Sequence, residues 1–155
     1  MIRHFHRKLL ALTGGSGNHA PRARQTVYGS AGGRALSHAW RDLTNSERRL
    51  IELLLTKEFP GADALRRQLE TARVSVIDAE GSLQFRVSGP PANVQRRVPT
   101  EGYYFDTEGV DYRPAVNVLL HVVEGKLHEL EVYKDDGSPI ETSLDAVDIS
   151  RFHLP

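Results

Sequence analysis

The sequence predicts an α+β fold, with an N-terminal helical hairpin packed on an antiparallel β-sheet. Apolar residues recur at helical spacing over residues 44–72, and at the two-residue spacing of strands from residue 74 onward. Helices followed by strands are typical of α+β domains, whereas alternating helices and strands indicate a parallel sheet. The chain has 155 residues, and this length favours a single domain.

The first helix is predicted to begin at Thr44, because Thr44 and Glu47 have the spacing of a capping box. Its apolar residues share one face: Leu50, Ile51, Leu54 and Leu55. Its charged residues are expected mostly outside: Glu47, Arg48, Glu52 and Lys57. A second helix is predicted over residues 63–72, where apolar residues again recur on one face. The two helices would form the hairpin that covers the sheet.

The best-defined strands lie in residues 115–140. Their apolar residues alternate: Val116, Val118, Leu120 and Val122, then Leu130 and Val132. Alternation places three side chains on the other face of the return strand: Glu129, Glu131 and Tyr133. Turns are predicted at 124–126 and 135–137, where Gly125 and Gly137 can adopt positive φ. The chain is therefore expected to build its sheet around this hairpin.

Shorter strands are predicted on both sides of this hairpin. Residues 74–77 and 83–87 alternate around a turn, and residues 94–98 and 102–105 are further candidates. Residues 147–154 are expected to form either a last strand or a covering segment.

The charges divide the chain into two parts. Residues 1–41 hold seven Lys/Arg, four His and no acid, so residues 42–155 hold all 20 acids and 20 − 7 = 13 bases. We therefore predict a flexible basic extension over 1–41 and an acidic domain over 42–155 with a formal charge of about −7. Gly-rich polar sequence favours poor order, and two alternatives stay open: an organellar transit peptide and a basic arm for nucleic acid.

Composition excludes several classes of protein. The chain has no cysteine, so disulfides, thiolate nucleophiles and cysteine zinc sites are excluded. No apolar run is long enough to cross a membrane, and none has the length of a secretory signal. A cytoplasmic protein is expected.

Two constellations resemble catalytic or metal sites. Carboxylates and Lys134 suggest a nuclease core, but Glu131 and Lys134 have E-x-x-K spacing, which places them on opposite strand faces instead of the single face that E-x-K would give. His121 and His128 lie in facing strands, and with a nearby carboxylate they could bind zinc or iron. Solvated charges and histidines at a sheet margin explain both patterns more simply. We therefore predict no metal and no cofactor.

Acidic residues and tyrosines are concentrated in residues 101–141. Tyrosines are common anchors of protein interfaces, and carboxylates steer a basic partner. Solvated acids beside half-buried tyrosines would give the same pattern. The predicted contact residues are Asp106, Glu108, Glu129, Glu131, Tyr133 and Asp135.

Three stretches of the chain resemble an uncharacterised family of small bacterial α+β proteins. The stretches are LTNSERRLIELLL from residue 43, VIDAEGSLQF from residue 76 and GKLHELEVYKDDGSPI from residue 125. Such proteins are often similar to immunity proteins of contact-dependent or polymorphic toxin systems. The resemblance implies a non-enzymatic protein that binds and neutralises a basic, nuclease-type toxin. The alternatives are a metal-dependent hydrolase or nuclease, and a nucleic-acid-associated module that acts through residues 1–41.

Overall fold

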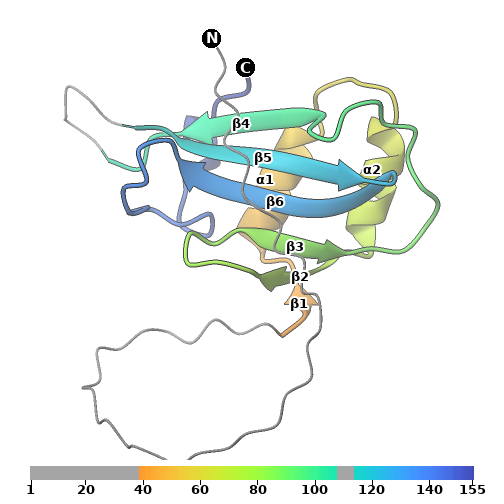
Figure 1. The fold of residues 1–155 in the computed structure, drawn as a ribbon, viewed down its shortest axis with the longest axis horizontal. Helices are drawn as coiled ribbons and strands as arrows, with labels where there is room; N and C mark the ends of the chain where they lie inside the picture. Colours follow the sequence, from red (N-terminus) through yellow and green to blue (C-terminus); the bar gives the residue numbers. More distant parts are fainter. Residues whose placement is uncertain (1–38, 108–113) are drawn as a thin grey trace, which may run out of the picture. The chain divides into compact units, whose positions relative to one another are not determined.

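An antiparallel sheet carries two α-helices on one of its faces (Figure 1). The computed structural model describes residues 39–107 and 114–155. The helices are α1 (Asn45–Leu54) and α2 (Ala62–Glu70), and a short 3-10 helix, η1, covers Ile149–Arg151. The strands are β1 (Arg41–Asp42), β2 (Arg73–Val76), β3 (Leu83–Arg86), β4 (Thr100–Tyr104), β5 (Val116–Val123) and β6 (Lys126–Lys134). The predicted α+β class is confirmed.

The sheet has the order β1-β2-β3-β6-β5-β4 over the described residues, so the β5–β6 hairpin lies at its centre. Val118 pairs with Val132 and Leu120 pairs with Leu130, and all four are buried on the face that the helices cover. Because side chains alternate along a strand, the acidic and tyrosine residues between them face the other way. The predicted hairpin and its alternation are confirmed.

The turn between β5 and β6 is shorter than predicted. Val123 pairs with Lys126, so Glu124 and Gly125 alone form the connection, and Lys126 is already in the strand. Glu124 has φ 51° and Gly125 has φ 72°. Two consecutive positive φ values are the signature of a tight hairpin turn whose twist matches that of the strands.

The capping box at the start of α1 is present. The Glu47 amide donates to Thr44 Oγ1 at 3.2 Å, and the Thr44 amide donates to Glu47 Oε2 at 2.8 Å. Arg41 donates to both carboxylate oxygens of Glu47, at 2.6 and 2.8 Å. The prediction that Glu47 lies outside is wrong, since the residue is 3% exposed. The capping box holds the Glu47 carboxylate against the Thr44 amide, and Arg41 pairs with it there.

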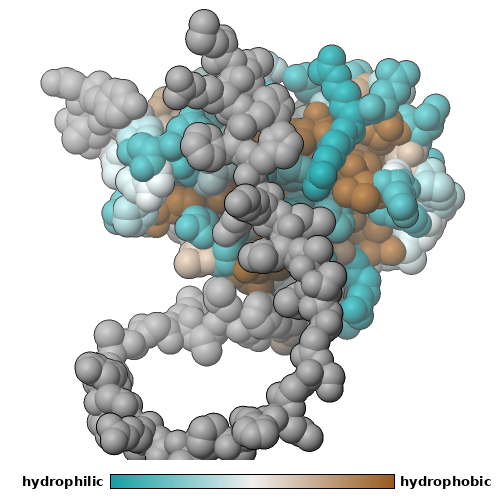
Figure 2. Space-filling view, viewed as in Figure 1, coloured by the Kyte–Doolittle hydropathy of each residue, from teal (hydrophilic) through white to brown (hydrophobic). Residues whose placement is uncertain are grey.

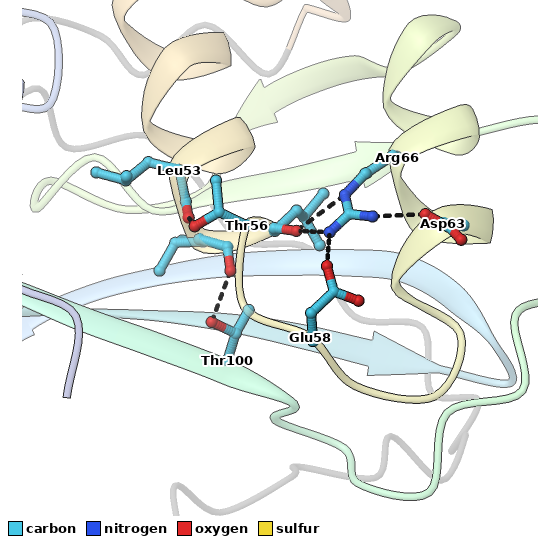
Figure 3. A network of polar contacts seen from close by, with 8 residues as sticks. Leu53, Thr56, Glu58, Asp63, Arg66 and Thr100 are labelled. Atoms are coloured by element: carbon cyan, nitrogen blue, oxygen red, sulfur yellow. Dashed lines mark hydrogen bonds and ion pairs between the residues drawn. The ribbon is translucent and has the colours of Figure 1, made fainter.

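The last carbonyl groups of α1 are also satisfied (Figure 3). Thr56 Oγ1 donates to Leu53 O at 2.7 Å, Thr100 Oγ1 donates to Leu54 O at 2.9 Å, and Arg66 Nε donates to Leu55 O at 2.9 Å. A helix end leaves four such carbonyls without helical partners. Side chains from α2 and β4 therefore fix the end of α1 against the second helix and the sheet.

Gln68 of α2 joins the helix layer to the β5–β6 turn. Its Nε2 donates to Pro90 O and Gly125 O, each at 2.9 Å, and its Oε1 accepts from the Leu127 amide at 3.0 Å. The residue is 2% exposed. A buried amide with all these partners holds three chain segments in register.

The structure corrects the prediction for residues 94–98 and decides between the two alternatives for residues 147–154. Residues 94–98 form no strand, although Arg97 O accepts from the Val122 amide at 2.7 Å. Residues 147–154 are a covering segment, because η1 is followed by Phe152, which is buried. His153 then forms two backbone hydrogen bonds with Tyr103 at the free edge of β4. The C-terminal segment thus covers a sheet edge that would otherwise be open.

The predicted extension over 1–41 lies almost entirely outside the described residues. Residues 39–41 are the exception, and of these Arg41 pairs with Val74 in the sheet. Among the described helices, none is long and apolar enough to span a membrane.

Candidate functional site

The side of the sheet that the helices leave uncovered, which we name the open face, holds the predicted acidic and tyrosine residues. Figure 1 looks onto this side, with both helices behind the strands. Paired residues of antiparallel strands point to the same face, so the register arranges the open face of β4, β5 and β6 in rows across the strands. On the visible part of this side, Figure 2 shows hydrophobic and hydrophilic residues mixed.

The first row is aromatic, with an amide at its middle. Tyr103 pairs with Asn117, and Asn117 pairs with Tyr133. Beyond β4, His153 stacks on Tyr103 with ring centroids 5.0 Å apart, and Phe105 meets Tyr103 edge-on at 5.8 Å. The Asn117 Nδ2 is buried and has no hydrogen-bond partner. This row therefore places one tyrosine on each side of an amide N–H donor that has no acceptor.

The second row is acidic, with an apolar residue at its middle. Glu101 pairs with Leu119, and Leu119 pairs with Glu131. Leu119 is only half-buried, while Glu101 is exposed. Two carboxylates thus flank one half-buried apolar side chain.

The third row begins with His121, which pairs with Glu129, and Glu129 pairs with Gln84 of β3. His121 Nε2 lies 2.8 Å from Glu131 Oε2 in the neighbouring row, while its Nδ1 is buried without a hydrogen-bond partner. The His121 side chain is 13% exposed and that of Glu131 is 36% exposed. This pair fixes the orientation of Glu131 on the surface.

A depression of about 240 Å³ lies over the first two rows. Its side chains are those of Glu101, Tyr103, Asn117, Leu119, Tyr133 and Pro155. The pKa of Tyr133 is raised, first by burial and then by the negative charges of Asp135, Glu131 and Glu101. The depression therefore lies in a negative local field, which favours a positively charged group.

Four of the six predicted contact residues are accessible or half-accessible. Glu129, Glu131 and Tyr133 lie on the open face, and Asp135 is exposed in the turn that follows β6. Glu108 lies outside the described residues. Asp106 requires a correction.

The Asp106 side chain is fully buried and does not belong to the open face. Its Oδ2 lies 2.9 Å from Lys134 Nζ and accepts from the Glu141 amide at 2.6 Å. Burial by itself would raise the pKa of this carboxyl, but these two partners outweigh burial and lower it. Asp106 therefore holds the segment after β6 in place and offers nothing to a partner.

The histidines do not form the metal pair that the sequence suggested. A register shift between β5 and β6 places His121 opposite Glu129 and leaves His128 without a cross-strand partner. Across the described ranges, no three His, Asp or Glu residues come close enough together to hold a metal ion. Glu131 and Lys134 point to opposite faces of β6, as their spacing predicted. The nuclease arrangement is therefore absent from this part of the chain.

Sequence reasoning missed the middle of the depression. Asn117 and Leu119 alternate with the buried valines of β5, and this pattern indicated that they face outward, but it did not indicate their neighbours. Pairing with β4 decides that they lie between Tyr103 and Glu101 on one side and Tyr133 and Glu131 on the other. The position of Pro155 depends on the path of the C-terminal segment and had no local signal.

Comparisons with known proteins give one match. A family model described as a domain of unknown function (DUF6984) matches residues 40–144, which is more than half of the chain. No curated protein matches, and no solved structure matches. The matched residues contain β1 to β6 and both α-helices, including all three rows of the open face except His153.

Proposed function

This chain belongs to the family described as a domain of unknown function (DUF6984), and we propose that it is an immunity protein that binds and neutralises a cognate bacterial toxin. The toxin would be a basic, nuclease-type domain, and it would dock on the open face. The protein would act by occupying its partner, without catalysis, in the cytoplasm. The toxin class rests on the resemblance to immunity proteins, while the choice of surface rests on the geometry.

One observation carries the choice of surface: tyrosines and carboxylates occupy adjacent rows of the sheet face that the two described α-helices leave uncovered. Tyrosines bury much area at little conformational cost, and they are enriched among residues that dominate binding energy. The carboxylates Glu101, Glu129 and Glu131 supply a field that accelerates encounter with a basic partner. A rigid sheet presents both without rearrangement, which reduces the cost of binding.

A metal-dependent hydrolase has less support from the geometry. It would use Asp106, His121, His128 and Glu131, but Asp106 is buried against Lys134 and His121 is hydrogen-bonded to Glu131. Titration with Zn²⁺ or Mn²⁺ tests this alternative, and tight stoichiometric binding would revive it. Nucleic-acid binding through the basic N-terminal segment predicts steeply salt-dependent affinity that is lost on deleting residues 1–38. The deletion should stop there, because Arg41 belongs to the sheet.

The proposal is tested by capture of partners from the native host with the tagged full-length protein. We expect one stoichiometric basic chain, which is toxic when expressed alone and harmless when expressed with this protein. The paired reversal Glu129→Lys and Glu131→Lys should abolish rescue and weaken binding at least tenfold. Its matched control is Glu52→Lys with Glu80→Lys, which changes the net charge equally at two exposed residues of α1 and the β2–β3 turn.

Circular dichroism and thermal melts establish that both double variants are folded. If the open-face reversal and the control rescue equally well, the open face is not the toxin-binding surface. If no captured chain is toxic, the immunity function itself is wrong.

A further inference from the structure

The depression on the open face, which we name the slot, lies over β4, β5 and β6 and is also lined by Pro155. Tyr103 and Tyr133 stand on β4 and β6, with Asn117 of β5 between them as the floor. Two strand spacings separate the tyrosine backbones by about 9.6 Å. A chain of methylene groups in contact with both rings needs roughly 7–8 Å between them, at ~3.5–4 Å on each side. Because side chains of a strand stand roughly perpendicular to the sheet, this backbone spacing leaves room for one extended side chain between the two tyrosines.

The slot continues into the acidic row. Two residues further along the strands, a distance of about 6.8 Å, Glu101 and Glu131 take the places of the tyrosines and Leu119 forms the floor. His121 occupies Oε2 of Glu131, which leaves Oε1 for another donor. Within the described residues, no hydrogen bond or ion pair involves the Glu101 carboxylate. The Glu101 carboxylate thus lines the far end of the slot, and Glu131 lies beside it across Leu119.

Asn117 adds a second, independent indication of a ligand. Its Nδ2 is buried and unpartnered in the floor of the slot. A buried donor without an acceptor costs free energy, so it marks a position where a bound acceptor is favourable. A backbone carbonyl of a docked chain would meet this need once the Asn117 amide turns toward the slot.

We propose that the slot is a subsite for one arginine of the partner protein. The aliphatic stem lies between Tyr103 and Tyr133 over Asn117, and the guanidinium lies over Leu119 between the carboxylates of Glu101 and Glu131. This inference rests on the proposed function for the identity of the partner, but its chemistry can be tested without the partner.

Arginine fits better than lysine for two reasons. Its planar guanidinium has five N–H donors in a fixed fork, so it can bind two separate carboxylates together. It is also more weakly hydrated than an ammonium and stacks on aromatic and flat apolar surfaces, here the Tyr rings and Leu119. A lysine ammonium would have to choose between the carboxylates or remain hydrated.

The test uses NMR titration of the isotope-labelled full chain at low salt with three blocked tripeptides. The probes are N-acetyl-Gly-Xaa-Gly-amide with arginine, lysine or citrulline at the centre. Citrulline keeps the length and planarity of arginine but lacks its charge. We expect the arginine peptide to shift the signals of the Asn117 side-chain amide and of Leu119 and Glu131. Lysine should bind at least threefold more weakly, and citrulline should produce no saturable shift.

Two variants locate the effect. Glu101→Gln with Glu131→Gln preserves the shape of the slot and should weaken the arginine peptide at least fivefold. Glu52→Gln with Glu80→Gln removes the same charge from exposed sites elsewhere and should leave the affinity unchanged. The spectrum of each variant reports whether it is folded.

The outcomes separate this inference from the proposed function. Absence of any shift, or equal binding of arginine and lysine, would overturn the arginine subsite. Toxin binding that depends on Glu129 and Glu131 but tolerates Glu101→Gln with Glu131→Gln would overturn the subsite and leave the immunity function intact. If the arginine peptide alone shifts the signals of Asn117 and Leu119 but no captured chain is toxic, the subsite is supported and the immunity function is wrong.

Discussion

Lys134 Nζ lies 2.9 Å from Asp106 Oδ2, and both side chains are buried, at 4% and 0% exposure. Lys134 also donates to Pro139 O at 2.8 Å, and the Glu141 amide donates to the same Asp106 oxygen. This pair therefore joins the end of β6 to the chain after β4 and to residues 139–141. Asp106, which the sequence suggested as a contact residue, thus stabilises the fold from within.

Replacement of Lys134 by Met should destabilise the protein by about 3 kcal/mol, because it leaves the Asp106 carboxylate buried without its cation. Adding Asp106→Asn to Lys134→Met should recover part of the loss, since a neutral amide has a lower desolvation cost. Urea denaturation of the two single variants and the double variant measures this coupling. Additive single effects would contradict the role of the pair.

Replacement of Gly125 by Ala should destabilise the protein more than replacement of Gly137 by Ala. Both glycines have positive φ, 72° and 70°, so each change carries the left-handed penalty of roughly 1–2 kcal/mol. A Cβ at Gly125 would in addition lie 2.5 Å from Ala92 O, whereas a Cβ at Gly137 meets nothing within 4 Å. We expect a difference of about 1–3 kcal/mol in thermal or urea unfolding. Equal losses would mean that the Ala92 segment moves aside freely.

Replacement of Gln68 by Ala should cost roughly 2–3 kcal/mol, because the buried Leu127 amide loses its side-chain acceptor and Gly125 O keeps only the Ala92 amide as a donor. The exposed Gln95 provides the control, and Gln95→Ala should stay within about 0.5 kcal/mol of the parent. Hydrogen exchange at the Leu127 amide gives a local reading. Its protection should fall in Gln68→Ala even where the rest of β6 remains protected. Unchanged protection would contradict this role for Gln68.

Lowering the pH should destabilise the start of α1, because the Glu47 carboxylate becomes protonated. Burial would raise the pKa of Glu47, but Arg41 and Thr44 outweigh burial and lower it. A folded pKa below the unfolded value means that stabilisation is fully present above about pH 4.3, the ordinary pKa of a glutamate, and is lost as the pH falls through the folded pKa.

Glu47→Gln removes this titrating group, so its stability should fall less steeply below that pH than the stability of the parent. Guanidinium unfolding from pH 3 to pH 7, in steps on the order of one pH unit, measures how the free energy of unfolding of each protein depends on pH. Glu80→Gln, at an exposed turn residue, is the control. Parallel curves for parent and Glu47→Gln would show that this carboxyl does not contribute to the acid response.

Local sequence patterns predicted much of the fold. The alternation of Val116, Val118 and Leu120 predicted which face of β5 is buried, and Thr44 with Glu47 predicted the helix start. These features depend on periodicity and on contacts within a few residues. The same reasoning placed Glu47 outside, because helical spacing does not show that Arg41 will lie beside it.

The candidate site was only half predictable for a similar reason. Alternation along β6 placed Glu129, Glu131 and Tyr133 together, and this was correct. It did not place Asp106, whose burial depends on Lys134 from another strand, and it did not show that the register shift would separate His128 from His121. Such features arise from pairing between distant segments, which a single sequence does not specify.

The sequence by itself determined the α+β class, the central hairpin, the cap of α1 and the acidic character of the domain, because each depends on composition or on near neighbours. Only the tertiary structure decided that Tyr103, Asn117 and Tyr133 form one row beside Glu101, Leu119 and Glu131. The physical reason is strand register: backbone hydrogen bonds between β4, β5 and β6 fix which side chains become neighbours, and a shift of one residue would send them to the opposite face.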